Sequence, residues 1–588
     1  MRIVRISIRN FRGIKNLDWD PSPRLNCLIG PGDVGKTTIL DAIEIALSPR
    51  YGFTGNDSDL HNCDTSNEPD LRVTLVGLPN EFLTEKKYGL NLRGWSDTES
   101  MLTDEPTESD IKALTVKATL DAGSLEWGWG IFNNRIDPDD PPRFSAADAR
   151  KLVPSRLGVY AERHLTWSRN SALSRMDGGP DTSSLLTTAM RSARASFVSS
   201  DRKSFDAATQ LAEDIGRQFL VPNRSKFEAQ LDIHSGAIAS GAVSLHDGNL
   251  PLRSLGSGSS RLMVAGLQLA NGTAPIGLID EIEIGLEPYR IMRLLRFLKT
   301  GKLNQQPDAD TVQANHQVII TTHSPVVVCE LKVDELHCVR SNAGTVTVLS
   351  VEKTAKGTNE AQRHVRTNPA AFLAPRIIIG EGKTEYGFLR RLDQRWSDDG
   401  FDSFAYNGVV PVDGTGKDSA LSFSIHLLKL GYECLVLMDS DATVSAVNER
   451  EIESLGGSIK KWPDGCDIEK RLFLDLPWEA VKRLVLFAIR DGGAGKVASN
   501  LKAIDSSFDE FSIEALLGLQ DSPNNRNIFA KASTLKVTRE NGGVIDKSWF
   551  KNIERGELLG QITFEHLEAC KLTPLGQIVQ EIRAWVDG

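Results

Sequence analysis

Residues 25–47 read "LNCLIGPGDVGKTTILDAIEIAL" and contain the most specific motif in the chain. A short apolar run, 25–29, leads into a glycine-rich loop that matches the GxxxxGK[ST] spacing in full. Apolar residues then recur at helical spacing. This order predicts a strand, a phosphate-binding loop and a helix whose N-terminus faces the phosphates of a nucleotide.

The side chains of this loop predict ATP with Mg²⁺ as its ligand. Lys36 would reach the β- and γ-phosphates, and Thr37 would hold the metal ion. The predicted nucleotide-binding residues of the loop are Gly30, Gly32, Gly35, Lys36, Thr37 and Thr38.

Three later segments complete the pattern of an ATPase. Residues 276–288, "IGLIDEIEIGLEP", end an apolar run with Asp280, which would hold the metal-bound water, and Glu281, which would act as a catalytic residue on the attacking water. Taken alone, this pair is equally typical of a helix N-cap. A glycine-serine stretch (252–270) precedes it and "VIITTHSPVVV" (318–328) follows it, which is the order found in an ABC-type ATPase head.

The segment "IRNFRGIKNLDW" (8–19), followed by the phosphate loop, resembles the start of the RecF, SMC and overcoming-lysogenisation-defect (OLD) ATPases. In these families ATP is sandwiched between two heads. The resemblance therefore implies a homodimer, in which Ser257 and Gly258 contact the γ-phosphate held by the partner and His323 is the switch histidine.

Two features depart from these relatives. No heptad run fills the interval between the two ATPase halves, which excludes an SMC-like coiled-coil arm. We instead expect a helical insert over 166–245, as a candidate dimerisation element, although surface amphipathic helices would look the same. ABC heads also carry a glutamine between the phosphate loop and the signature, whereas the first glutamine here is Gln210. Asp59 or His61 could replace it, or both could belong to an ordinary polar loop.

A second set of acidic residues follows two apolar runs in the C-terminal half. Residues 376–390, "RIIIGEGKTEYGFLR", place Glu381 after one run, and 431–443, "GYECLVLMDSDAT", place Asp439 and Asp441 after another. Alternation with helical stretches predicts a parallel α/β sheet, in which strand ends meet at one edge. Carboxylates gathered there repel one another unless a divalent cation neutralises them.

This glutamate and DxD pattern resembles TOPRIM domains of topoisomerases, primases and OLD nucleases. The chain lacks a recognisable breakage-reunion tyrosine, and its seven scattered cysteines do not form a zinc module. Hydrolysis by metal-activated water remains, which favours a nuclease. Similarity to the OLD family, including the Gabija nuclease subunit, implies cleavage of DNA with two Mg²⁺ (or Mn²⁺) ions.

The same resemblance implies further site residues. Glu385 lies one helical turn after Glu381. Asp467 and Glu469 match the second acidic cluster, unless they simply begin a solvated helix. Lys547 matches the catalytic lysine, with Lys551 as a nearby rival, and either could be a snorkelling surface lysine. The predicted metal ligands are Glu381, Glu385, Asp439, Asp441, Asp467, Glu469, Thr37 and Asp280, and the predicted catalytic residues are Glu381, Asp439, Asp441, Lys547 and Glu281.

Bulk properties set the remaining expectations. A chain of 588 residues with 40% hydrophobic content should form several domains of a globular protein. The net charge of −10 is mild evidence against a DNA substrate. No apolar run is long enough to span a membrane, and the first residues alternate like a strand, so we expect a cytoplasmic protein.

We therefore predict an α/β protein with an ABC-type head (1–165 and 246–368), the insert and a TOPRIM domain (369–588). Its predicted function is that of an ATP-regulated, metal-dependent DNA endonuclease in phage defence or DNA repair. A helicase partner could be encoded nearby. The alternatives are a RecF-like clamp or loader, in which the TOPRIM fold is structural, and a TOPRIM enzyme acting on RNA or nucleotides.

Overall fold

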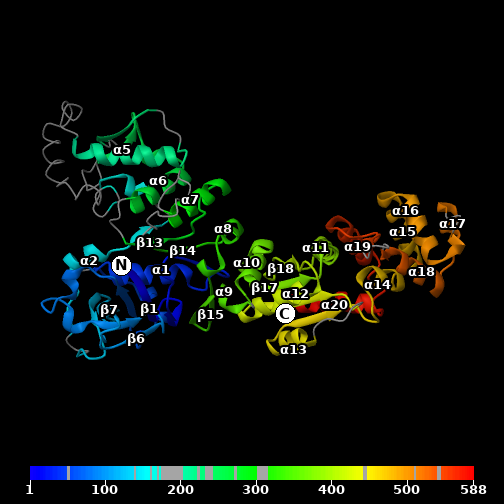
Figure 1. The fold of residues 1–588 in the computed structure, drawn as a ribbon, viewed down its shortest axis with the longest axis horizontal. Coiled ribbons are helices and arrows are strands. Elements are labelled where there is room, and N and C mark those ends of the chain that lie inside the picture. Colours follow the sequence, from blue (N-terminus) through cyan, green and yellow to red (C-terminus); the bar gives the residue numbers. More distant parts are fainter. Residues whose placement is uncertain are drawn as a thin grey trace. The chain divides into compact units, whose positions relative to one another are not determined.

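The computed structural model forms two compact units, Met1–Val351 and Glu352–Gly588, which are described separately (Figure 1). The sequence placed this boundary between 368 and 369. In the structure α9 (Val351–Thr354) bridges the division and α10 (Thr358–Thr367) belongs to the second unit. The described residues are 1–49, 53–137, 141–158, 162–167, 171, 173, 203–221, 225–231, 243–270, 275–300, 316–355, 357–440, 446–508, 512–538 and 544–588.

The first unit is built on one large mixed sheet, which within the described residues runs in the order β6-β5-β7-β4-β1-β2-β16-β15-β3-β14-β13-β9, with β8 on β7. The strands around β3 pair in parallel, and those around β1 pair antiparallel. The parallel group is β3 (Leu25–Ile29), β14 (Gln317–Thr321), β13 (Ile276–Ile279), β9 (Ser155–Leu157) and β15 (Leu336–Asn342). The others are β1 (Arg2–Phe11), β2 (Ile14–Trp19), β4 (Asp70–Val76), β5 (Arg93–Ser96), β6 (Met101–Thr103), β7 (Ile111–Leu120), β8 (Trp127–Phe132) and β16 (Thr345–Ser350).

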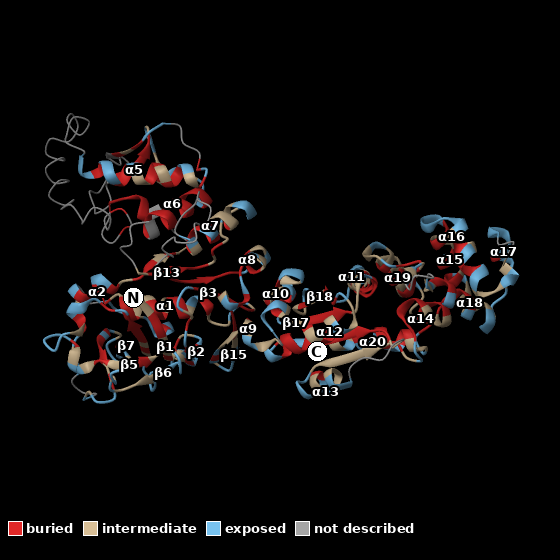
Figure 2. Ribbon diagram, viewed as in Figure 1, coloured by how far each residue is buried: buried red, intermediate tan, exposed pale blue. Residues whose placement is uncertain are grey.

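Burial explains the two kinds of strand. All five residues of β3 are buried, as expected for a strand covered on both faces, and α1 (Lys36–Leu47) follows it directly. The antiparallel β1 alternates instead, burying Ile6 and Ile8 while Arg5 and Arg9 lie on its polar face. Figure 2 shows the strands of this unit largely in the colours of buried and intermediate residues.

The predicted insert contains both helix and strand. Helix α5 (Lys203–Gln218) buries Phe205, Ala208 and Ala212 along one side, as the helical spacing predicts. The strands β10 (Phe227–Leu231), β11 (Val243–Asp247) and β12 (Leu250–Pro251) then form a small antiparallel sheet, which the sequence analysis did not foresee. Much of 166–245 lies outside the described residues. The chain continues with α6 (Ser257–Ala270) and α7 (Pro288–Thr300).

The second unit contains the predicted parallel α/β sheet. Its strands are ordered β18-β17-β19-β20, and each pair is parallel. The strands are β17 (Arg376–Gly380), β18 (Val409–Asp413), β19 (Glu433–Met438) and β20 (Ser458–Lys461). The helices are α11 (Lys383–Asp398), α12 (Lys417–Lys429), α13 (Ala446–Ser454), α14 (Ile468–Asp475), α15 (Trp478–Gly492), α16 (Ala494–Ile504), α17 (Ile513–Gly518), α18 (Pro523–Ser533), α19 (Ile553–Glu565) and α20 (Pro574–Asp587).

Helices α11 and α19 cross at very short distance because small residues line the crossing. A Cβ atom on Gly556 would collide with the carbonyl oxygen of Thr384, and one on Gly560 would lie 2.7 Å from that of Phe388. The Thr384 hydroxyl also donates to the Phe550 carbonyl oxygen at 2.9 Å. These contacts fix the segment just before α19 against the first turn of α11.

The last helix closes the sheet of the second unit. Arg376, the first residue of β17, donates from Nη1 to the Val586 carbonyl oxygen at 2.8 Å and from Nη2 to that of Trp585. Its guanidinium also stacks on the Trp585 ring at 4.3 Å from the ring centroid. No helix within the described ranges is both long and apolar enough to cross a membrane.

Two candidate active sites

The glycine-rich loop joins β3 to α1 as its motif predicts. Gly35 precedes α1 with φ of 94°, and Gly30 has φ of 135° with no room for a Cβ, which would lie 2.6 Å from the Val339 carbonyl oxygen. The Lys36 ammonium donates to the carbonyl oxygens of Gly30 (3.0 Å) and Pro31 (2.6 Å), and its burial lowers its pKa. The other predicted loop residues, Gly32 and Thr38, lie in the loop and in the first turn of α1.

Asp280 follows β13 directly and faces the start of α1. Its Oδ1 accepts hydrogen bonds from the hydroxyls of Thr37 (3.1 Å) and Thr321 (2.7 Å). Glu281 comes next with φ of 44°, and its N–H donates to the Thr321 hydroxyl at 2.8 Å. The structure therefore brings together the two predicted Mg²⁺ ligands of the head. Their oxygen donors beside a phosphate loop fit a Mg²⁺–nucleotide complex.

The residues predicted to face a partner head lie at two neighbouring loops. Ser257 is exposed at the start of α6, whereas Gly258 is buried. Gly258 packs so closely on the Gly285 carbonyl oxygen that a Cβ atom at position 258 would collide with it. His323 is exposed, and its N–H donates to Glu283 Oε1 at 2.6 Å. The packing of Gly258 within its own head is sufficient to require glycine. Its contact with a partner stays a prediction.

The candidates for the missing glutamine lie beside the β1–β2 turn. Arg12 Nε donates to Asp59 Oδ1 at 2.8 Å, and His61 Nδ1 lies 2.7 Å from the Arg12 carbonyl oxygen.

The head's candidate metal site contains a further charged residue, Arg156. It belongs to β9, the strand next to β13, and its guanidinium lies 3.2 Å from Asp280 Oδ2. Sequence analysis missed Arg156 because a strand of three residues carries no detectable period.

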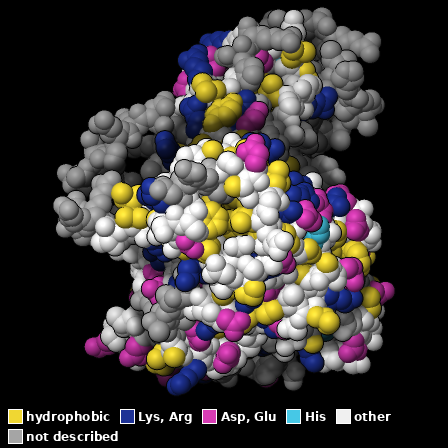
Figure 3. All heavy atoms as spheres, turned by 90° about the vertical axis from the view of Figure 1, so that its right-hand side faces the viewer, with side chains coloured by type: hydrophobic (Ala, Val, Ile, Leu, Met, Phe, Trp, Pro, Cys, Tyr) yellow, Lys and Arg dark blue, Asp and Glu magenta, His cyan; other side chains and the backbone are white. Residues whose placement is uncertain are grey.

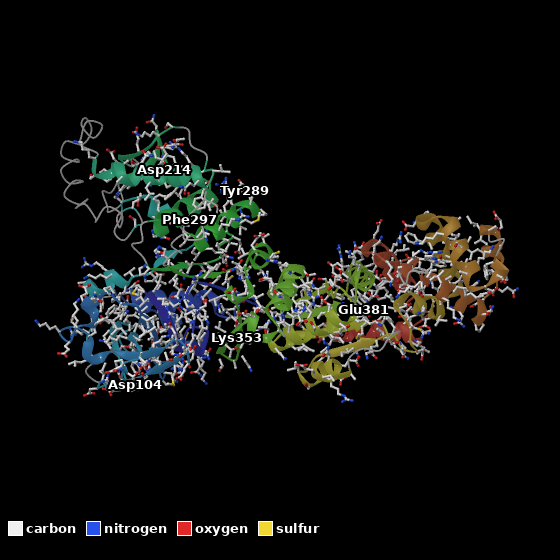
Figure 4. The ribbon with its side chains drawn as sticks, viewed as in Figure 1. Asp104, Asp214, Tyr289, Phe297, Lys353 and Glu381 are labelled. Carbon is white, nitrogen blue, oxygen red and sulfur yellow. The ribbon has the colours of Figure 1, made fainter. Side chains whose placement is uncertain are left out.

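In the second unit, Glu381 (labelled in Figure 4) and Asp439 follow the adjacent parallel strands β17 and β19. Glu381 Oε2 accepts a hydrogen bond from the Asp439 N–H at 3.0 Å. Asp439 Oδ1 accepts one from the N–H of Ile468, the first residue of α14, at 3.2 Å. The predicted Asp441 lies outside the described residues.

Three more predicted carboxylates come from α11 and α14. Glu385 accepts from the Gly382 N–H at 2.9 Å, and Asp467 caps α14 by accepting from the Lys470 N–H at 2.8 Å. Glu469 is fully buried, so it does not lie on a solvated helix face, and neither of its oxygens has a hydrogen-bond partner among the described residues. A buried carboxylate without hydrogen bonds, beside other carboxylates, is a donor that suits a divalent cation.

The electrostatics of this cluster are those of crowded acids. Burial, together with the charges of Glu385 and Glu381, raises the pKa of Asp439 to about 10. Burial likewise raises the pKa of Glu469 to about 8 and raises that of Glu385. The protein therefore holds these side chains close together at a cost in charge repulsion, which is typical of a functional site.

The structure distinguishes between the two candidate lysines by their surroundings. Lys551 Nζ lies 3.6 Å from Glu469 Oε1, and the charges of Glu469 and Glu385 raise its pKa although burial lowers it. The contact recorded for Lys547 is made by its backbone, because its main-chain N–H donates to the Leu535 carbonyl oxygen at 2.9 Å. A catalytic role for Lys547 stays a prediction, while Lys551 is the lysine that the fold brings to the carboxylates.

The carboxylates are held by the backbone of the protein in this structure. Glu381, Glu385 and Asp439 each accept from a main-chain N–H, and within the described ranges no group of three or more His, Cys, Asp and Glu stands ready to hold a metal ion. The donor chemistry nevertheless fits hard divalent cations, because every side chain involved is a carboxylate.

Family models match both units. The model described as "AAA domain, putative AbiEii toxin, Type IV TA system" matches residues 25–329, which is just over half of the chain. The model described as "Overcoming lysogenization defect protein-like, TOPRIM domain" matches residues 372–441. The second match contains Glu381 and Asp439.

Curated relatives match a small part of the chain. The DNA replication and repair protein RecF of Desulforamulus reducens is 34% identical over 97 residues, which is 16% of this chain and 26% of RecF. RecF of Lactobacillus acidophilus is 38% identical over 64 residues, 11% of this chain and 17% of RecF. The chain thus spans about a quarter or less of the length of these relatives.

Solved structures of SMC heads are also similar. A head bound to the C-winged helix domain of ScpA gives a TM-score of 0.36 at 14% identity, over 60% of this chain and 99% of that one. The SMC head domain from Thermotoga maritima gives 0.30 at 14% identity, over 60% of this chain and 100% of that one.

Proposed function

The chain belongs to the OLD family, in which an ATPase domain precedes an OLD-like TOPRIM domain, and on this premise we propose that it is a divalent-metal-dependent DNA endonuclease. The observation that carries the proposal is the cluster of buried carboxylates near the ends of β17 and β19, with Lys551 beside Glu469. ATP at the head would regulate cleavage. The biological setting would be phage defence or DNA repair.

The residues of the cluster divide the work of phosphodiester hydrolysis. Two cations would be held by Glu381, Glu385, Asp439, Asp441, Asp467 and Glu469, and when bound they would activate water and neutralise phosphate charge. Lys551, which stays protonated because its pKa is raised, would contact the scissile phosphate and offset its negative charge. Lys547 remains the candidate that family resemblance suggests.

Bound metal ions would also explain how a chain with a net charge of −10 could bind DNA, which is itself negatively charged. On the face visible in Figure 3, the Lys and Arg side chains of the described residues are interspersed with Asp and Glu. A DNA backbone would therefore depend on bound cations at the carboxylate cluster more than on a broad basic surface.

The head would act as an ATP-dependent dimer. Thr37 and Asp280 would hold Mg²⁺, Lys36 would bind the phosphates, and Glu281 would orient the attacking water. The exposure of Ser257 and His323 suits residues that contact a partner head. A helicase encoded nearby remains a proposed partner.

The second candidate is a RecF-like clamp or loader with a non-cleaving TOPRIM domain. The RecF matches are consistent with it, but they cover at most 16% of this chain, and a non-cleaving TOPRIM domain would give the carboxylate cluster no catalytic role. A structural TOPRIM domain would gain stability by replacing a crowded acid such as Glu469 with an apolar residue.

The test is cleavage of supercoiled plasmid with Mg²⁺ or Mn²⁺. The unmodified chain should cut, Asp439→Ala should lose at least about a hundredfold in rate, and Lys36→Ala should be altered without being abolished. Lys551→Ala should lose more than the matched Lys547→Ala. Absence of cutting under every metal and nucleotide condition would contradict the nuclease and favour the loader. Equal or greater loss in Lys547→Ala would return the catalytic role to Lys547.

A further inference from the structure

Arg156 lies at the head's metal site, in a position that neither the motif nor the family match assigns. Its side chain is nine-tenths buried and touches three carboxylates. Nη2 lies 2.9 Å from Asp41 Oδ1 and 3.2 Å from Asp280 Oδ2, and Nε lies 3.9 Å from Glu44 Oε2. Asp41 and Glu44 belong to α1, the helix that begins at the phosphate loop.

The topology puts this guanidinium where a metal sensor would stand. Strand β9 pairs with β13, so its end lies beside Asp280 at the sheet edge that faces the phosphate loop. The two oxygens of Asp280 are divided between the guanidinium of Arg156 and the hydroxyl of Thr37. The Gln268 side chain donates to the Arg156 carbonyl oxygen at 3.2 Å and so joins α6 to this strand.

One donor of Arg156 is left over. Its Nη1 is buried and has no hydrogen-bond partner among the described residues. A free guanidinium N–H next to a phosphate loop can donate to a phosphate oxygen.

We propose that Arg156 is a positioning residue that supplies part of the positive charge which Mg²⁺ provides in other heads. The proposal rests on the ATP site proposed above. Without the guanidinium, the phosphates of ATP would meet the uncompensated charge of Asp280, whereas Asp41 would keep its ion pair with Arg12. With it, they meet a neutralised Asp280, so that less of the positive charge that Mg²⁺ brings is needed for binding. Nucleotide binding therefore depends weakly on Mg²⁺.

The experiment compares the Kd of a non-hydrolysable ATP analogue in EDTA and in Mg²⁺. The ratio of the two constants should be within about threefold of unity for the unmodified chain and should rise about tenfold or more in Arg156→Gln. The matched control is Arg12→Gln, because Arg12 also pairs with Asp41, at 2.6 Å, and its other carboxylate partner is Asp59. That variant should leave the ratio unchanged.

A folded Arg156→Gln with the ratio of the unmodified chain overturns the proposal, and so does an equal rise in Arg12→Gln. Should Arg156→Gln fail to fold, Arg156→Lys replaces it. An ammonium reaches fewer carboxylates at once than a guanidinium, so the ratio should still rise about threefold, and an unchanged ratio overturns the proposal. If the unmodified chain binds no nucleotide with or without Mg²⁺, the ATP site itself is contradicted, which is a different failure.

Discussion

Glu469 shows at the scale of one residue how function competes with stability. Its carboxyl is fully buried, its oxygens have no hydrogen bond from the part of the chain that the structure describes, and burial raises its pKa from 4.5 to about 8. Because the folded state holds the proton more tightly than the unfolded state, the protonated form stabilises the fold. That contribution is complete below pH 4.5 and is lost as pH rises towards 8.

We therefore predict that, in EDTA, the free energy of unfolding of the second unit falls as pH rises from 5 to 8. The variant Glu469→Gln should lessen the fall by about 1–3 kcal/mol, because an amide does not ionise. Urea unfolding at both pH values measures the difference, and Glu479→Gln, an exposed residue on α15, is the matched control. A fall of the same size in both variants contradicts the assignment. Added Mg²⁺ should restore stability at pH 8 if the cluster binds it.

Single residues also mark the limit of what sequence could predict. The phosphate loop was predictable in full, because its spacing and its local context suffice. The sequence could not show which of Lys547 and Lys551 lies beside the carboxylates. That depends on where α19 packs and not on the residues next to each lysine in the sequence. Arg156 was missed, because its role depends on the pairing of β9 with β13 across more than a hundred residues of chain.

At the scale of elements, the crossing of α11 and α19 positions the candidate active site. Gly556 permits the close approach, and Lys551 lies just before α19 while Glu385 lies in the first turn of α11. The distance between these helices thus sets the distance between the lysine and the carboxylates.

Gly556→Ala should separate the two helices and lower the free energy of unfolding by about 1–3 kcal/mol, through overpacking. It should also reduce plasmid cleavage, although Gly556 touches none of the carboxylates. Gly495→Ala is the matched control, since a Cβ in that helix of the same unit meets open space. Plasmid cleavage and the free energy of unfolding are measured for both variants. A Gly556→Ala variant that is destabilised but fully active would show that the helix crossing does not position Lys551.

The insert shows why element prediction fails locally. Helix α5 has a clear apolar period and was expected. In β10 and β11, apolar and polar residues alternate over only five residues each. So short an alternation does not outweigh the helical pattern of the neighbouring sequence. Their pairing is non-local, so it becomes visible only in the folded chain.

At the scale of the whole molecule, each of the two units has a large buried core. One large cluster of buried apolar residues lies between Ile3 and Val346, and another lies between Ile378 and Val586. The α/β class and the order of head and TOPRIM domain were therefore predictable from two independent sets of motifs, while the boundary between them was not, since α9 and α10 carry no motif.

Residues 352–588 should accordingly fold when expressed alone. We expect one cooperative thermal transition by circular dichroism and, with Mg²⁺ or Mn²⁺, plasmid cleavage that no longer responds to ATP. Residues 1–351 are the reciprocal control and should bind nucleotide without cutting. A fragment 352–588 that lacks a cooperative transition would contradict the independence of its core.

The attachment of β17 to the end of the chain has a consequence for timing during synthesis. Arg376 finds its acceptor carbonyls 209 and 210 residues later. At about 5–20 residues per second, the ribosome needs about 10–40 s to cover that interval. During that interval the residues of the head have already been synthesised. The contacts of β17 with the last helix cannot yet form, and Lys551 is absent for most of the interval. A nascent chain thus completes its phosphate-binding loop long before it completes its cluster of carboxylates, so the two sites would become functional in that order.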